Sequence, residues 1–174
     1  MSGCMSAFGG MPPAELSKGL KQLKEEHLPL LEQLDGLFRL TKKIDQDESI
    51  LTNFTNLSKK VKEFQEALDP HSEKEEGVLF PMMGTYIGTT SGPIAVMEYE
   101  HDQAKLKIKT FLEKTNNNNH SPEEMKNLSA LIQEAYFILT EHFAKEENVL
   151  FPMAERILSD EEKEKLYQRI QEIE

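Results

Sequence analysis

The sequence is poor in cysteine and in cationic residues, and each shortage excludes a class of function. Cys4 is the one cysteine among 174 residues, so neither an intrachain disulfide nor a cysteine-rich zinc or iron–sulfur site is possible. Lysine and arginine number 20 against 31 acidic residues, which gives a formal net charge of −11. So acidic a chain is repelled by the phosphate backbone of nucleic acids and by anionic membrane surfaces. We therefore expect neither of these as a partner.

Long hydrophobic runs are also missing. No run reaches the roughly 18 apolar residues that a membrane-spanning helix needs. Residues 1–13 are rich in glycine, serine, methionine and proline, and they lack the basic and apolar regions of a signal peptide. We predict a flexible tail over residues 1–13 of a cytoplasmic protein. Cys4 is expected to be an ordinary exposed thiol, because no neighbouring group would activate it.

The apolar residues that are present recur at alternating spacings of three and four, which is typical of amphipathic helices. Four long stripes cover residues 16–44, 50–82, 94–111 and 125–153, and a shorter one follows Ser159. No segment alternates with the period of a strand. Four long helices with short loops favour an all-α, up-down-up-down four-helix bundle with a short fifth C-terminal helix. We expect one bundle domain over residues 14–157 and the last helix over residues 158–174.

Glycine and proline mark the expected breaks. The segment 84–92 is predicted to be a loop, with Pro93 in the first turn of the next helix. Ser121, followed three residues later by glutamate, predicts a capping box. Pro29 and Pro70 fall inside helical stripes, each within two residues of a histidine. Each removes a backbone donor and is expected to kink or restart its helix there.

Six polar residues lie on the apolar stripes, where polar side chains are unusual. Each long helix carries one histidine, and on two helices a glutamate follows four residues later, on the same face. Burying a carboxylate without a partner is costly, and a metal ion removes that cost. A lone core histidine is usually a hydrogen-bonded structural residue, but that interpretation does not account for all six. The candidate metal ligands are His27, His71, Glu75, His101, His142 and Glu146. His120 lies in a loop, off every stripe, and is left out.

An internal repeat supports a symmetrical site. Residues 71–82 and 142–153 read HSEKEEGVLFPM and HFAKEENVLFPM, identical at nine of twelve positions. The chain is therefore interpreted as a duplicated helix pair with a pseudo-twofold axis, which predicts two metal ions with similar ligands. Imidazole and carboxylate ligands without thiolate suit iron, manganese or zinc. Open positions on iron favour chemistry with dioxygen, peroxide or nitric oxide.

The ligand pattern His…His-x-x-x-Glu…His…His-x-x-x-Glu resembles the hemerythrin-like family, the HHE cation-binding domains, over about residues 15–155. The sequence EE-x-VLFP after both paired histidines is also typical of that family. The resemblance implies two non-haem iron ions, oxo- or hydroxo-bridged, with Glu75 and Glu146 as bridging ligands. It further implies that His27 and His142 serve one iron, and that His71 and His101 serve the other.

Two positions differ from the oxygen-carrying hemerythrins. Lys105 stands where those proteins have a second histidine, and Glu146 stands where they have an aspartate. Reversible oxygen carriage is therefore not favoured. The sequence is more similar to the di-iron proteins that repair iron–sulfur clusters, which usually carry a further cysteine-containing domain at the N-terminus.

The sequence also predicts the surroundings of some charged residues next to the candidate ligands. Glu26, Glu100 and Glu141 each precede a ligand histidine and are expected to be mostly solvated, because adjacent helical residues point about 100° apart. Lys74 and Lys145 recur in both repeats and are expected to pair with carboxylates around the site.

Three functions stay open, and whether the chain is an enzyme is open with them. The first is a di-iron protein that binds or reacts with dioxygen, peroxide or nitric oxide in sensing, detoxification or iron handling. The second is iron donation for the repair of damaged iron–sulfur clusters. The third is a binding module, in which a zinc-filled or metal-free bundle presents the last helix to a partner.

Overall fold

The computed structural model describes residues 15–116 and 119–173, and the predicted tail with Cys4 lies outside these residues. The helices are α1 Lys18–Asp45, α2 Ile50–Lys74, α3 Phe80–Ile87, α4 Gly92–Thr115, α5 Pro122–Lys145, α6 Phe151–Ile157 and α7 Asp160–Gln171, and the π-helical turns are η1 Glu75–Leu79 and η2 Glu146–Leu150. The prediction of an all-helical bundle is confirmed. No helix in the described part of the chain is long and apolar enough to cross a membrane.

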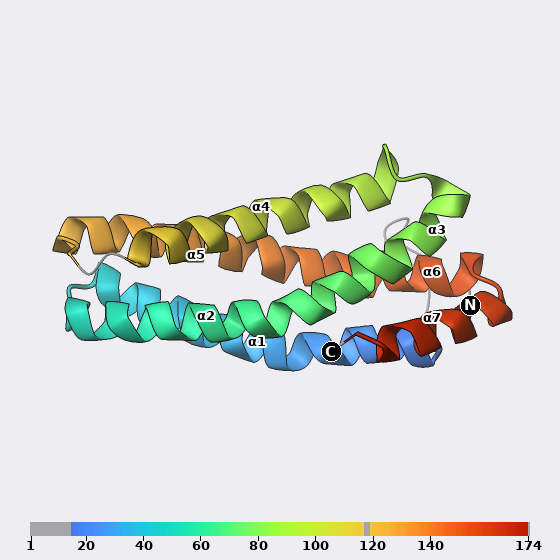
Figure 1. Cartoon of the computed structure of the whole chain (residues 1–174), viewed down its shortest axis with the longest axis horizontal. Coiled ribbons are helices and arrows are strands. Elements are labelled where there is room, and N and C mark those ends of the chain that lie inside the picture. Colours follow the sequence, from blue (N-terminus) through green and yellow to red (C-terminus); the bar gives the residue numbers. More distant parts are fainter. Residues whose placement is uncertain (1–14, 117–118, 174) are drawn as a thin grey trace, which may run out of the picture.

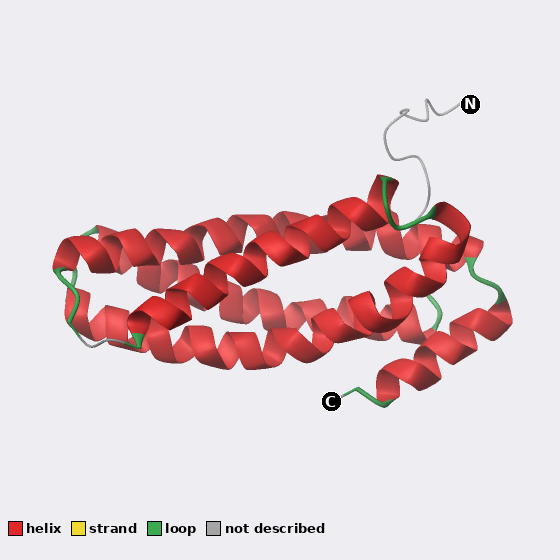
Figure 2. Cartoon of the chain, turned by 45° about the horizontal axis from the view of Figure 1, so that its top comes forward, coloured by secondary structure: helices red, strands yellow, loops and turns green. Residues whose placement is uncertain are grey.

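The bundle consists of four long rods that lie side by side (Figure 1). Two rods are single helices, α1 and α4. The other two are composite, because η1 joins α2 to α3 and η2 joins α5 to α6. α1 packs against both α2 and α5, and α4 packs chiefly against α5. Figure 2 shows the described loops that connect the four rods gathered at the two ends of the bundle.

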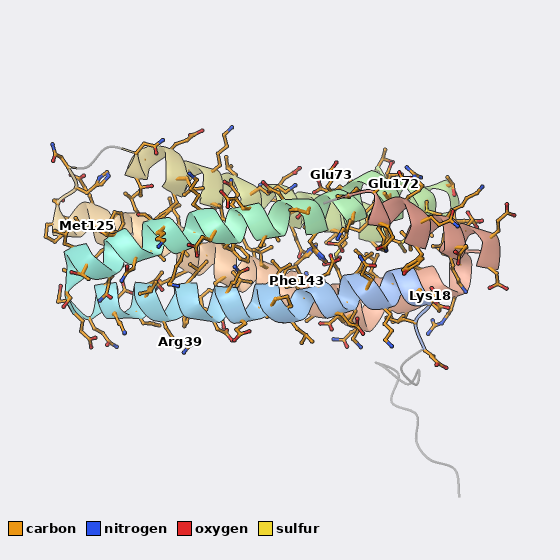
Figure 3. All side chains as sticks on the ribbon, turned by 60° about the horizontal axis from the view of Figure 1, so that its bottom comes forward. Lys18, Arg39, Glu73, Met125, Phe143 and Glu172 are labelled. Carbon is orange, nitrogen blue, oxygen red and sulfur yellow. The ribbon has the colours of Figure 1, made fainter. Side chains whose placement is uncertain are left out.

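Two apolar clusters fill the bundle, and the predicted stripes supply them. One cluster surrounds Phe64, Phe111 and Phe143, and the other surrounds Phe80 and Phe151. Figure 3 shows Phe143 near the middle of the bundle, between the ends marked by Met125 and Lys18. A layer of buried histidines and glutamates lies between the two clusters. The fold thus surrounds one polar layer with apolar packing on both sides.

The two prolines inside the long helices do not restart them. α1 runs through Pro29 and α2 runs through Pro70 without interruption, so the expectation of a restart was wrong. A proline removes one hydrogen bond, and the packed faces on either side hold the remaining turns together.

The irregular backbone comes instead at the two π-helical turns. Each turn begins at a candidate ligand, Glu75 or Glu146, and ends just before a Phe-Pro pair. The widened hydrogen bonds run from the Phe80 amide to the Glu75 carbonyl and from the Phe151 amide to the Glu146 carbonyl. Both candidate ligands thus open a widened turn of the same form, and Pro81 and Pro152 follow it in the first turn of α3 and α6.

The predicted loop over residues 84–92 is shorter in the structure. α3 continues to Ile87, so only residues 88–91 connect it to α4. Gly84 lies inside α3 and packs so closely on Thr89 that a Cβ would collide with it. At Gly84 the glycine signal came from close packing, whereas Gly88 and Gly92 take the positive φ values of 80° and 78° at the turn itself. Pro93 does lie in the first turn of α4, as predicted.

The helix starts follow the capping signals. The Ser121 hydroxyl accepts a hydrogen bond from the Glu124 amide at 3.1 Å, which is one half of the capping box predicted at the start of α5, while the Glu124 side chain contacts His120. Ser159 and Glu162 form the complete reciprocal box at the start of α7. α7 then folds back along the first turns of α1 and buries Leu166 in the cluster around Phe80.

Gly19 sets the distance between α1 and α7, and it can be tested against a second glycine of α1. A Cβ on Gly19 would lie 3.1 Å from Leu166 Cγ and 3.2 Å from the Tyr167 amide nitrogen, whereas a Cβ on Gly36 meets nothing within 4 Å. We expect Gly36→Ala to raise the free energy of unfolding by about 0.5–1 kcal/mol. The free energy of unfolding of Gly19→Ala should be about 1–3 kcal/mol lower than that of Gly36→Ala, because the added methyl group overpacks the contact with α7. Urea unfolding of the two variants measures the difference, and equal stabilities would contradict the close contact.

Candidate metal centre

The structure brings all six candidate ligands into the polar layer. The four histidines come from four different helices, α1, α2, α4 and α5, and the two glutamates open the two π turns. All six side chains are buried, with at most 2% of any of these residues exposed. Residues far apart in the sequence therefore converge on one point, as the positions of the stripes predict.

Each glutamate lies between histidines of two helices. Glu75 Oε1 is 2.9 Å from His71 Nε2 and 3.8 Å from His101 Nε2. Glu146 Oε1 is 3.0 Å from His142 Nε2 and 3.6 Å from His27 Nε2. In both cases the shorter distance belongs to the histidine one helical turn earlier on the same rod. The longer distance links two rods.

The ligand atoms fall into two groups, and both glutamates belong to both groups. Within each group these atoms all lie within 4.8 Å of one another. One group is His27, His71, Glu75 and Glu146, and the other is Glu75, His101, His142 and Glu146. Shared carboxylates between two sets of histidines are the arrangement that a two-metal centre requires.

The pairing of histidines implied by the family resemblance was wrong. His27 pairs with His71, with ring centroids 4.9 Å apart, and His101 pairs with His142 at 4.2 Å. The reason is the packing of α1 on α2 and of α4 on α5, which sets neighbours in the sequence side by side. Each half of the centre thus takes its histidines from one pair of consecutive long helices.

The buried polar atoms of this layer fit metal ions. The Nε2 atoms of the four histidines and both carboxylate oxygens of Glu75 and Glu146 are buried and have no hydrogen-bond partner outside this layer. Native proteins rarely leave such atoms unsatisfied, because each carries a large desolvation penalty. Four imidazole nitrogens and two carboxylates form a donor set that suits iron, manganese or zinc. Coordination would satisfy every one of these atoms.

Protonation in this layer depends on the neighbouring charges. Burial opposes the charged form of His71, but Glu75 and Glu26 beside it raise its pKa to about 9. Burial lowers the pKa of His27 to about 4, and burial together with the charge of His101 lowers that of His142 to about 3. Burial favours the neutral form of Glu75, yet the adjacent imidazoles lower its pKa to about 2. A metal cation would replace the shared proton as the partner of these carboxylates.

A second set of glutamates faces the outer nitrogens of the imidazoles. The Nδ1 atoms of His71, His101, His142 and His27 lie 2.9, 2.8, 3.3 and 3.6 Å from carboxylate oxygens of Glu26, Glu76, Glu100 and Glu147. In the first three pairs Nδ1 donates a hydrogen bond to the carboxylate. A proton held on Nδ1 leaves Nε2 free to coordinate a metal, which is how histidine ligands are usually oriented.

Lysines form ion pairs with three of the four glutamates that face the outer nitrogens, which we call the outer carboxylates. Lys74 lies 2.7 Å from Glu26 and Lys145 lies 2.6 Å from Glu100, as the repeat suggested. Lys105, the departure from the oxygen carriers, lies 3.1 Å from Glu76. It therefore supports a ligand histidine instead of replacing one.

Sequence reasoning missed most of the outer carboxylates. Glu26 and Glu100 were expected in solvent, but each reaches a histidine of a neighbouring helix, which spacing along its own helix does not reveal. Glu76 and Glu147 were not considered, although each directly follows a ligand glutamate in both repeats. That repeated Glu-Glu pair was the available signal. Glu141 is exposed, as expected.

His120 lies outside the centre. It contacts Glu124 at 3.3 Å and belongs to neither ligand group.

Comparison with known proteins agrees with this geometry. The model of the hemerythrin HHE cation-binding domain matches residues 18–154. The iron-sulfur cluster repair protein YtfE of Escherichia coli O1:K1 / APEC is 40% identical over 102 residues, which are 56% of this chain and 46% of that protein. YtfE of Escherichia fergusonii and of Escherichia coli O127:H6 gives the same values. The chain thus aligns with less than half the length of these relatives.

The buried carboxylate of Glu146 should reduce the stability of the metal-free protein. Its two oxygens lack hydrogen bonds, so we expect Glu146→Leu to raise the free energy of unfolding in chelator by about 1–3 kcal/mol. With iron present the order should reverse, because the parent gains binding energy that the variant loses. Thermal unfolding in each condition measures this. The exposed Glu141→Leu should change stability by less than about 0.5 kcal/mol in both conditions. A metal-free variant less stable than the parent would contradict the argument.

Proposed function

This chain belongs to the hemerythrin HHE cation-binding domain family, and we propose that its six clustered ligands hold two iron ions. The observation that carries the proposal is that Glu75 and Glu146 each belong to both ligand groups, as bridging carboxylates must. His27 and His71 would be the remaining protein ligands of one ion. His101 and His142 would be those of the other.

The fold bounds are part of the same proposal. Residues 14–157 would form the iron-binding bundle, with the four long helices in up-down-up-down order, and residues 158–174 would form a separate closing helix. That order would bring the histidines of four helices to one level. The cytoplasmic location also stays a prediction.

We infer that the reactant is small. Bound iron supplies redox and ligand-binding chemistry toward dioxygen, peroxide or nitric oxide. The chain's own side chains close the site around it. The Phe143 ring stacks on His27 at 4.2 Å, and Phe80 lies 5.8 Å from His101. With apolar clusters on both sides, these rings exclude bulk water and favour small reactants.

We further propose that sensing, detoxification and iron handling are the roles to test, with iron–sulfur cluster repair as the alternative. The repair role is supported by the name of the relatives, which are iron-sulfur cluster repair proteins. The match covers less than half of those proteins. That this chain shares their activity is therefore a proposal. In that role the bundle would give up iron.

The hypothesis of a binding module receives less support. It requires the last helix to offer its apolar face to a partner. α7 instead buries Leu166 and Ile170 in the bundle's own core. The apolar face of that helix is therefore already occupied within the chain.

Iron content tests the main proposal directly. Protein loaded anaerobically with iron should contain about two ions per chain, and its absorption spectrum should change with nitric oxide or peroxide. His71→Ala should lower the iron content and the spectral response, because it removes a buried ligand nitrogen. The matched His120→Ala variant removes a histidine outside both ligand groups and should behave like the parent. Zinc at full stoichiometry, with no spectral response in iron-loaded protein, would favour the binding module.

The repair alternative needs a different assay. Iron-loaded parent and His120→Ala protein should restore the activity of an enzyme whose iron–sulfur cluster has been damaged by nitric oxide, whereas His71→Ala should not. Equal recovery with His71→Ala, or none with the parent, would exclude iron donation and leave the small-ligand role in place.

A further inference from the structure

The two halves of the candidate centre differ in how firmly their histidines are held. His71, His101 and His142 each donate Nδ1–H to a glutamate, and a lysine binds each of those glutamates. His27 is the exception. Both of its ring nitrogens are buried without a hydrogen-bond partner, and Glu147 lies 3.6 Å from Nδ1.

The difference follows from one position in the duplicated sequence. Lys105 comes four residues after His101 and binds Glu76, the outer carboxylate of that histidine. Four residues after His27 stands Leu31, which packs against the apolar core instead. Glu147 therefore has no lysine or arginine within 4.0 Å in the part of the chain that the structure describes. The pseudo-twofold symmetry of the outer residues is broken at this one place.

Surface pockets reach the same half. A pocket of about 350 Å³ is lined by Glu147 together with Lys21, Lys24 and Leu28. A second pocket of about 170 Å³ is lined by Glu26, His71 and Lys74. Both pockets lie beside outer residues of the half that contains His27 and His71. Exposure itself does not separate the halves, since Glu147 is 27% exposed and Glu76 30%, so the missing lysine at Glu147 is the feature that distinguishes them.

We propose that the metal held by His27 and His71 is the exchangeable ion, and that the metal held by His101 and His142 is retained. The inference rests on the proposed two-ion centre and deepens it by naming the ion that the protein gives up first. Lys105 is then a positioning residue, which fixes Glu76 and through it the His101 ring. Loss of a carboxylate that orients a ligand histidine typically lowers metal affinity by about 10–100-fold.

Chelation kinetics test the inference on the full chain. Two-iron protein mixed with an excess of a coloured iron chelator should release one ion per chain in a fast phase and one in a phase about tenfold slower. Lys105→Met should accelerate only the slow phase, because it leaves Glu76 in the state of Glu147. Leu31→Lys should slow only the fast phase, because it supplies the absent lysine. Circular dichroism verifies the helix content of each variant.

Further variants assign the phases to the two halves. Lys74→Met should accelerate the fast phase alone, and Lys145→Met the slow phase alone, since each lysine supports one half. Lys107→Met removes a lysine that pairs with Glu134 away from the centre, and it should change neither phase. Leu31→Met controls for altered packing at residue 31 and should leave the fast phase unchanged.

The outcomes separate the inference from the proposed function. Fewer than two iron ions per chain in the parent would overturn the proposed centre and this inference together. Two ions released in a single phase would overturn the inference alone. So would a fast phase that responds to Lys105→Met or Lys145→Met, because the exchangeable ion would then lie in the other half.

Discussion

The structure depends on one constraint, the burial of two carboxylates in the middle of an apolar bundle. Glu75 and Glu146 are fully buried, and imidazole nitrogens face their oxygens, the nearest being Nε2 of His71 at 2.9 Å and Nε2 of His142 at 3.0 Å. Groups of this kind are stable in a core only when something of opposite charge joins them. Nitrogen and oxygen donors surround these two carboxylates, and they come from the polar layer and its two π turns. The outer glutamates orient the histidines among them, and the apolar clusters on either side exclude water.

The fold and the inner ligands were predictable because both follow from spacing along single helices. The stripes of Phe64 and Phe111 lie in the core where their period places them, and His71 with Glu75 shares one face because four residues make about one turn. Pro29 and Pro70 do not restart their helices, because a packed helix tolerates a lost hydrogen bond. The irregular turns lie instead at Glu75 and Glu146, just before the repeated Phe-Pro pairs.

The outer residues were not predictable in the same way, because their contacts cross between helices. Glu26 points away from its neighbour His27 and binds His71, 45 residues later. Spacing within one helix cannot reveal such a contact, since it depends on which rods are adjacent. The same limit produced the wrong pairing of the histidines. The packing of α1 on α2 and of α4 on α5 decides the pairing of the histidines and the contacts of Glu26 and Glu100, whereas Glu76 and Glu147 reach histidines of α4 and α1 across the other two pairs of rods.

The twelve-residue repeat combines several parts of the candidate centre in one short segment. One copy, residues 71–82, carries two candidate ligands, a glutamate that faces a histidine of another rod and a lysine that binds a glutamate of a third. The widened turn inside it is continuous with the α-helices on both sides. Two copies supply four of the six candidate ligands, and α1 and α4 need contribute only one histidine each. In the proposed two-ion centre, the two halves can diverge through changes outside the repeat alone, as at Leu31.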